Sequence, residues 1–189
     1  GETRIFKEGL YALVLLKDRN LLLKAAVAEP IQAENIRTAV AAAEILKLRG
    51  LALSDKEIIR GIMNMELPAR LARDRRGYYV SVAHNPAAVT EMIKAVKKLH
   101  PGRKLIYVFS ALADKDIPGM LKAVKKHGNA AMVLTSIKNP RAISLEKLKA
   151  LVVKYRMPHY CEPDNIKALR LARRIRGNGV IVIGGSFYL

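Results

Sequence analysis

The segment Val80–Pro86, with the sequence V-S-V-A-H-N-P, decides the fold of this chain. Its apolar residues predict the end of a buried strand, and Asn85 followed by Pro86 predicts the capped start of a helix. Two later segments, Val108–Asp116 and Gly184–Leu189, also change from an apolar run to small and polar residues. Open α/β sheets bind ligands where their parallel strands end. We therefore expect the three junctions to face one crevice.

Strand and helix patterns alternate along the chain after Pro68. We expect strands near 78–83, 104–110, 130–135, 156–160 and 180–184, and helices near 86–99, 117–128, 144–155 and 164–176. This alternation predicts an α/β fold, a mostly parallel sheet flanked by helices.

The segment before Pro68 has a different pattern. It predicts a hairpin within residues 4–27, a helix from Pro30 to Leu48 that Gly50 stops, and a short helix after a capping box that pairs Ser54 with Glu57. These elements have too few strands to close a sheet alone, which is typical of the tail of a larger domain. We therefore expect two domains, residues 1–66 and residues 67–189.

The charge of the chain is strongly positive, with 34 Lys and Arg against 16 Asp and Glu and a net charge of +18. Residues 67–189 hold twenty-four of the cations and seven of the carboxylates. Such a field concentrates anions, for example nucleotides, an oligoglutamate tail or nucleic acid. Most of these cations recur at helical spacing, however, which is typical of solvated helix faces. With three Phe, seven Tyr and no Trp, the chain offers few platforms for stacking single-stranded bases.

Several classes of protein are disfavoured by what the sequence lacks. The single cysteine, Cys161, excludes an intrachain disulfide, and no charged-then-apolar leader is present, so we expect a cytoplasmic protein. The longest apolar runs, such as Val180–Ile183, are too short for a membrane span. His159 and Cys161 form one H-x-C pair without a second pair, so we expect no metal site. No P-loop motif, G-x-x-x-x-G-K-[ST], occurs in the chain.

In their amino-acid sequence and in their order along the chain, the three junctions resemble motifs of one protein family. They are similar to D-G-A-H-N-P, V-F-G-x-L-x-D-K-D and G-S-L-Y-L in the carboxy-terminal domain of the folylpolyglutamate synthase/dihydrofolate synthase family, a branch of the Mur ligase superfamily. Upstream, Ile31–Ala39 resembles the H-Q-x-x-N-x-x-x-A helix that ends the family's central ATPase domain, and Leu67–Leu71 resembles its W-P-G-R-L-E junction. The resemblance runs from about Ile31 to Leu189, with five motifs in the family's order.

The resemblance implies part of an ATP-dependent ligase that joins glutamate to a folate. Enzymes of this family use ATP and Mg to phosphorylate a substrate carboxylate, and the amino group of glutamate then attacks the acyl phosphate. This chain would bind the incoming amino acid and close over the nucleotide. The P-loop, the magnesium ligands and most folate contacts would come from a missing N-terminal half, so we expect the chain alone to be inactive.

The resemblance also implies roles for particular residues. His84 would lie beside the incoming glutamate, with Asn85 and Ser186 as further substrate contacts, and Arg70 would reach toward the ATP phosphates. At Ser81, the second candidate catalytic residue, the family has an aspartate that helps hold the amino acid. A serine hydroxyl cannot supply that fixed negative charge. Either the substrate differs, another residue takes the role, or the ligase function is lost.

Each candidate residue also has a plainer interpretation. A lone histidine such as His84 is often structural, Arg70 could be a surface arginine at a hinge, and a Gly-Gly-Ser turn can be merely flexible. Asp114–Asp116 could be a metal or phosphate cluster, but carboxylates at such a loop more often form a helix cap and local ion pairs. For the whole chain, the alternatives are a non-catalytic binding or regulatory domain and a basic nucleic-acid-binding module.

Overall fold

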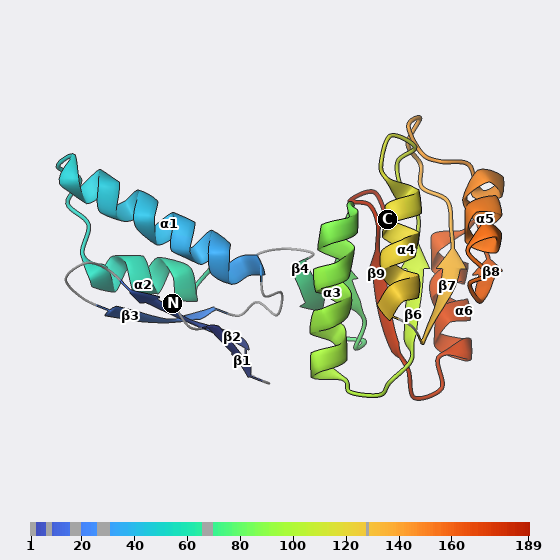
Figure 1. Cartoon of the computed structure of the whole chain (residues 1–189), viewed down its shortest axis with the longest axis horizontal. Helices are drawn as coiled ribbons and strands as arrows, with labels where there is room; N and C mark the ends of the chain where they lie inside the picture. The colour runs from blue at the N-terminus through green and yellow to red at the C-terminus, as the bar shows by residue number, and fades with distance from the viewer. Residues whose placement is uncertain (1–2, 7–8, 16–19, 26–30, 66–69, 128) are drawn as a thin grey trace. The chain divides into compact units, whose positions relative to one another are not determined.

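The computed structural model describes residues 3–6, 9–15, 20–25, 31–65, 70–127 and 129–189 (Figure 1). The chain divides into two compact units, residues 1–68 and residues 69–189. Within the described ranges, no helix combines the length and apolar character that a membrane span requires.

The first unit contains a three-stranded antiparallel sheet and two helices. Strands β1 (Thr3–Phe6), β2 (Gly9–Leu15) and β3 (Asn20–Ala25) pair in the order β1-β2-β3. The β2–β3 pair confirms the predicted hairpin, although its connecting residues 16–19 lie outside the described part of the chain. Sequence analysis did not anticipate β1 as a third strand.

The two helices of this unit begin and end where their local signals predict. Helix α1 spans Ile31–Leu48, and Gly50 after it has a φ of +94° that suits glycine. Helix α2 spans Asp55–Met63 and has the predicted capping box. The side chain of Glu57 accepts from the backbone amide of Ser54 at 2.7 Å, and the Ser54 hydroxyl accepts from the amide of Glu57 at 3.3 Å.

The second unit is an α/β sheet in the strand order β4-β5-β9-β6-β7-β8. Its strands are β4 (Arg70–Arg73), β5 (Tyr79–Ser81), β6 (Leu105–Phe109), β7 (Ala130–Leu134), β8 (His159–Cys161) and β9 (Val180–Gly184). Neighbouring strands from β5 to β8 are parallel, and β4 is an antiparallel edge strand on β5. The predicted, mostly parallel sheet is therefore confirmed.

Four helices connect these strands: α3 (Pro86–Leu99), α4 (Ile117–His127), α5 (Leu145–Lys154) and α6 (Asn165–Ile175). Each of them begins with a side-chain cap, including the predicted cap at Asn85. Asn85 accepts from the amide of Ala88 at 2.8 Å, Asp116 accepts from the amide of Gly119 at 2.8 Å, and Ser144 accepts from the amide of Lys147 at 3.3 Å.

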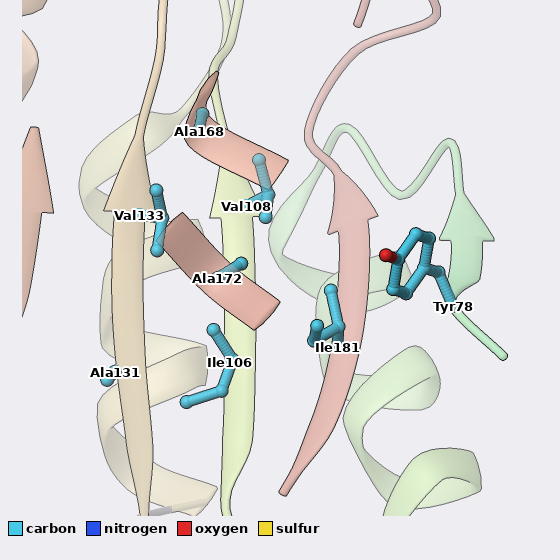
Figure 2. Close-up of a cluster of buried hydrophobic side chains, with 8 residues drawn as sticks. All are labelled: Tyr78, Ile106, Val108, Ala131, Val133, Ala168, Ala172 and Ile181. Atoms are coloured by element: carbon cyan, nitrogen blue, oxygen red, sulfur yellow. The ribbon is translucent and has the colours of Figure 1, made fainter. Parts of the chain in front are cut away.

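The core lies on both faces of the central strand β6, whose five residues are all buried. Helices α3 and α4 lie on one face of the sheet and α6 on the other (Figure 1). Ala168 and Ala172 of α6 face the strands beside Ile106 and Val108 (Figure 2). Their small side chains let the helix approach the sheet closely.

Candidate functional site

The three sequence junctions meet at one edge of the sheet. Strands β5, β9 and β6 are adjacent, and their last residues are in register: Ser81 and Phe109 are both Cα partners of Gly184. The carboxyl ends of these parallel strands therefore lie side by side, and we call this the carboxyl edge. It is the edge at which open α/β sheets bind ligands.

Two glycines allow the junctions to approach closely. A Cβ on Gly184 would clash with the carbonyl oxygen of Ser81 and would lie 3.1 Å from the Tyr107 hydroxyl. A Cβ on Gly185 would clash with the carbonyl oxygen of Ser110 and would lie 2.5 Å from the Phe109 ring. Gly185 also has a φ of +101°, which L side chains rarely adopt. The carboxy-terminal turn therefore fits between the other two junctions only with glycine at both positions.

His84 lies just beyond the end of β5 and is partly buried. Its Nδ1 is 2.9 Å from the carbonyl oxygen of Val82. Because a carbonyl can only accept, Nδ1 carries the proton, and Nε2 is the nitrogen available to a ligand. The His84 ring also lies 6.4 Å from the ring of Phe187, centroid to centroid, at a tilt of 40°. The first and third junctions thus meet through their side chains.

Asn85 follows His84 in the chain. Ser186 lies in the carboxy-terminal turn, directly before Phe187, whose ring is near that of His84. The Asn85 side-chain oxygen caps α3, which leaves the amide NH2 group as its donor to a ligand. The Ser186 hydroxyl accepts from the amide of Tyr188 at 3.2 Å and keeps its own proton to donate. Only 8% of Ser186 is exposed, so a ligand would meet a largely preformed hydroxyl.

Ser81 lies beneath this surface, because it is the last residue of β5 and is only 1% exposed. Two more buried hydroxyls lie nearby in the sheet, on Tyr107 and Ser110, and neither has a hydrogen-bond partner among the described residues. Burial raises the pKa of Tyr107 well above its ordinary value, so its hydroxyl stays protonated. Sequence analysis missed both hydroxyls, since they lie within an apolar run and at its end.

The other candidates lie at the margin of the carboxyl edge. Arg70 is the first residue of β4 and the Cα partner of Ser81, but its side chain lies outside the described part of the structure. Asp114 forms an ion pair with Arg141 at 2.6 Å and a longer one with Lys115 at 3.6 Å. Partial desolvation raises the pKa of Asp114, but the Arg141 hydrogen bond, a backbone hydrogen bond and the charges of Arg141 and Lys115 together outweigh it and leave that pKa below its usual value. The Asp114–Asp116 segment is thus a cap with local ion pairs.

Sequence analysis also missed two exposed aromatic residues at the edge. Phe187 is 68% exposed and Tyr188 is 55% exposed, although large apolar side chains are usually covered. The signal available in the sequence was the aromatic pair itself, directly after the Gly-Gly-Ser turn. At the Phe187 position the family pattern has leucine.

Comparison with known proteins decides the family. A family model described as Mur ligase, glutamate ligase domain, matches residues 67–187. The chain belongs to the Mur ligase family. The dihydrofolate synthase/folylpolyglutamate synthase of Bacillus subtilis is 26% identical over 161 residues, which cover 83% of this chain and 37% of that protein. A UDP-N-acetylmuramoyl-L-alanyl-D-glutamate–2,6-diaminopimelate ligase of Fusobacterium nucleatum is 31% identical over 148 residues, which cover 72% of this chain and 30% of that protein.

Solved structures of Mur ligases share this fold. The folylpolyglutamate synthase of Mycobacterium tuberculosis, complexed with ADP and AMPPCP, matches with a TM-score of 0.81 at 23% identity, over 98% of this chain and 44% of that chain. The folylpolyglutamate synthase/dihydrofolate synthase of Yersinia pestis, complexed with AMPPNP and a Mn ion, matches with a TM-score of 0.73 at 25% identity, over 92% and 40% of the two chains. These matches confirm the expected resemblance to the folylpolyglutamate synthase branch. The chain spans less than half the length of these relatives.

The sequence contains no P-loop, and the described residues include no group of three His, Cys, Asp or Glu side chains that could hold a metal ion. The carboxyl edge instead presents neutral donors and an imidazole. Among the described side chains, that set can donate hydrogen bonds to a carboxylate and accept one from an ammonium group.

Proposed function

We propose that this chain is the glutamate-binding part of an ATP-dependent ligase that joins glutamate to a folate-type acceptor in the cytoplasm. The observation that carries the proposal is the contact between the first and third junctions, through the rings of His84 and Phe187, at the carboxyl edge of a Mur ligase sheet. ATP and magnesium serve such a ligase by activating the acceptor carboxylate. The activation needs a P-loop, so it belongs to a nucleotide-binding segment that this sequence does not contain.

The side chains at this edge match the groups of a free amino acid. The NH2 group of Asn85 and the amino-terminal end of α3 favour a carboxylate, because the helix end carries partial positive charge. The Ser186 hydroxyl adds a third donor from the carboxy-terminal turn. Neutral His84 can accept a hydrogen bond from the ammonium group at Nε2, while Val82 fixes the ring through Nδ1.

Histidine also suits the amide-forming step. The amino group of the incoming amino acid must lose a proton as its nitrogen bonds to the activated carbon. An imidazole whose Nε2 is unprotonated is a group at this edge that can take that proton. We therefore assign His84 the central role and treat Ser81 as a buried residue beneath it.

The serine at position 81 bears on which amino acid the site binds. The folate branch has an aspartate at this position, and a diaminopimelate-adding ligase is also similar to this chain. A second candidate is therefore a ligase of the same mechanism that adds a different amino acid, such as 2,6-diaminopimelate. In either case the ammonium group would rely on His84 rather than on a carboxylate.

Calorimetric titration of the whole chain tests the proposal. L-glutamate, L-aspartate and 2,6-diaminopimelate are titrated into the wild type, His84→Ala and His159→Ala. His159 is the matched control, because it is also partly buried and its Nδ1 also lies near a carbonyl two residues earlier, at 3.0 Å from Met157. We expect glutamate to bind most tightly, and His84→Ala to weaken it about tenfold, the loss of one charge-assisted hydrogen bond.

Two outcomes would contradict this proposal. Equal weakening by His84→Ala and His159→Ala would show that the carboxyl edge is not the site. Absence of binding for all three amino acids would favour a relative that has lost the chemistry. Tighter binding of 2,6-diaminopimelate than of glutamate would instead select the second candidate.

A further inference from the structure

The opposite edge of the sheet carries most of the charge of the second unit. Its amino edge consists of the end of β4 with the β4–β5 turn, and of the last residues of each helix with the described residues that follow them before the next strand: 73–77, 97–104, 125–127, 154–158 and 173–179. These segments hold fourteen of the twenty-four Lys and Arg of residues 67–189, but only one of the seven carboxylates. All fourteen cations are exposed.

Hydrogen bonds join these segments into one surface. The amide of Val180 donates to the carbonyl of Lys104 at 2.8 Å, and the amide of Leu105 donates to the carbonyl of Asn129 at 3.0 Å. The loops after α3 and α6, and Asn129 after α4, therefore lie together at the lower ends of the strands in Figure 1. The amide of Met132 in β7 donates to the carbonyl of Pro158 at 2.8 Å, and Tyr79, just after the β4–β5 turn, lies 2.9 Å from Nε2 of His100 through its hydroxyl, so the other two segments lie at the same end of the sheet.

The charge of this edge is not compensated locally. Its one carboxylate, Asp74, accepts from the backbone amides of Arg76 and Tyr78 at 2.9 Å each and thereby holds the turn. None of the fourteen cations forms an ion pair with any described residue. In contrast, Lys94, Lys115 and Arg141, which lie elsewhere in the unit, all pair with carboxylates.

Helix capping accounts for only a small part of this charge. Cations in the last turn of a helix balance about half a negative charge at its end, so the four helices α3–α6 need about two positive charges in total. Half of the fourteen cations lie outside the helices, at the end of β4, in the β4–β5 turn or in loops: Arg73, Arg75, Arg76, Arg103, Lys104, Arg156 and Arg176. The remainder is a net field that attracts a polyanion.

Two histidines at this edge respond to that field. Burial lowers the pKa of His100, and the nearby charges of Arg103 and Arg73 lower it further. Burial likewise lowers the pKa of His127, together with Lys97, Lys126 and Lys94, and Glu91 opposes them only weakly. A bound polyanion would neutralise these cations and raise both pKa values.

The make-up of the edge indicates which polyanion fits. Eight of its fourteen cations are arginines, whose planar donor forks match phosphate oxygens. Its described residues include no exposed aromatic side chain on which an unpaired base could stack, which disfavours single strands. Among the described residues next to this edge, Val153 and Tyr160 are the large apolar side chains that are exposed, too few to anchor in a lipid surface.

We propose that the amino edge binds the phosphate backbone of a nucleic-acid duplex, on the side of the sheet opposite the amino-acid site. The contacts are electrostatic and independent of base sequence. This surface goes beyond the proposed ligase function and does not depend on it. A ligase with this edge would reside on nucleic acid while its carboxyl edge stays open to substrate.

Fluorescence anisotropy with the full chain tests the proposal. The probes are labelled 20-base-pair RNA and DNA duplexes of mixed sequence, and unlabelled competitors are an oligoglutamate and phosphatidylserine vesicles. The edge variant combines Arg103→Gln, Lys104→Gln, Arg173→Gln and Arg174→Gln. Its matched control removes the same number of exposed charges elsewhere in the unit, by Lys122→Gln, Lys138→Gln, Lys147→Gln and Lys149→Gln.

We expect duplexes to bind the wild type and the control within twofold of each other, and to bind the edge variant at least tenfold more weakly. The slope of log affinity against log salt should fall by about 0.9 for each phosphate contact removed, so by up to about 3.6 in the edge variant. The duplex should also raise the pKa values of His100 and His127, followed by NMR. A difference in affinity between the RNA duplex and the DNA duplex would identify which of the two the edge prefers.

Three outcomes would overturn the proposal. Equal losses in the edge variant and the control would show that only the overall charge matters. Stronger binding to vesicles or to the oligoglutamate than to either duplex would assign the edge to another class of partner. Unchanged histidine pKa values at saturating duplex would place the nucleic acid elsewhere on the protein.

Discussion

Replacing Gly185 with alanine tests how tightly the three junctions fit together at the carboxyl edge. The new Cβ would clash with the carbonyl oxygen of Ser110 and with the Phe109 ring, 2.5 Å away. Two costs therefore add. An alanine in the left-handed region, at a φ of +101°, costs about 1–2 kcal/mol, and overpacking a buried site costs about 1–3 kcal/mol. We expect a loss of about 2–5 kcal/mol in the free energy of unfolding.

Two control variants separate these costs. Gly102→Ala has a φ of +72° and open space around the Cβ, so it should show the backbone cost alone. Gly184→Ala has no positive φ but clashes with the Ser81 carbonyl, so it should show the packing cost alone. Urea unfolding followed by circular dichroism gives the three losses for the second unit. If Gly185→Ala cost no more than Gly102→Ala, the close approach of the carboxy-terminal turn to β6 would be refuted.

Three further predictions follow from buried and titrating groups. Tyr107→Phe should raise the free energy of unfolding by about 1 kcal/mol, because it removes a buried hydroxyl that has no hydrogen-bond partner among the described residues. A lower free energy of unfolding, measured in urea, would show that the hydroxyl does form a hydrogen bond. The free energy of unfolding should fall as pH drops below about 6.5, because the lowered pKa of His100 makes the folded protein bind fewer protons than the unfolded chain. The variant His100→Gln should reduce this fall. An unchanged urea midpoint between pH 7.5 and 5.5 in the wild type would contradict the prediction. Ser81→Asp should tighten glutamate binding, measured by calorimetry. Because the position is buried, the same change should cost on the order of 1–3 kcal/mol in the free energy of unfolding. Weaker glutamate binding would mean that the site prefers an anion.

Local signals allowed much of the fold to be predicted. Helix α3 begins and ends where the Asn85-Pro86 cap and the apolar period place it, and the capping box of Ser54 and Glu57 located α2 in the same way. These features depend on residues a few positions apart. Strand β4 was missed because Arg-Leu-Ala-Arg is short and polar, and its structure depends on pairing with β5.

The sequence predicted where in the fold the site lies, but not which side chains are buried or exposed there. The sequence indicated that His84 follows a strand end, and the structure places it there, opposite Phe187. The burial of Ser81 could not be predicted, because it depends on which strands flank β5. The cationic amino edge could not be predicted either, since the helical spacing of its cations does not reveal that four helices end on the same side.

The central claim is that an amino acid binds at His84, and NMR of the chain with 15N-labelled histidine tests it most directly. Glutamate is titrated in while the ring nitrogens of His84 and His159 are followed at constant pH. We predict a saturable shift of the His84 Nε2 signal, with Nδ1 keeping its proton on the Val82 carbonyl and His159 unchanged. A saturable shift confined to His159, or no shift of His84 at glutamate concentrations that saturate binding by calorimetry, would contradict the account.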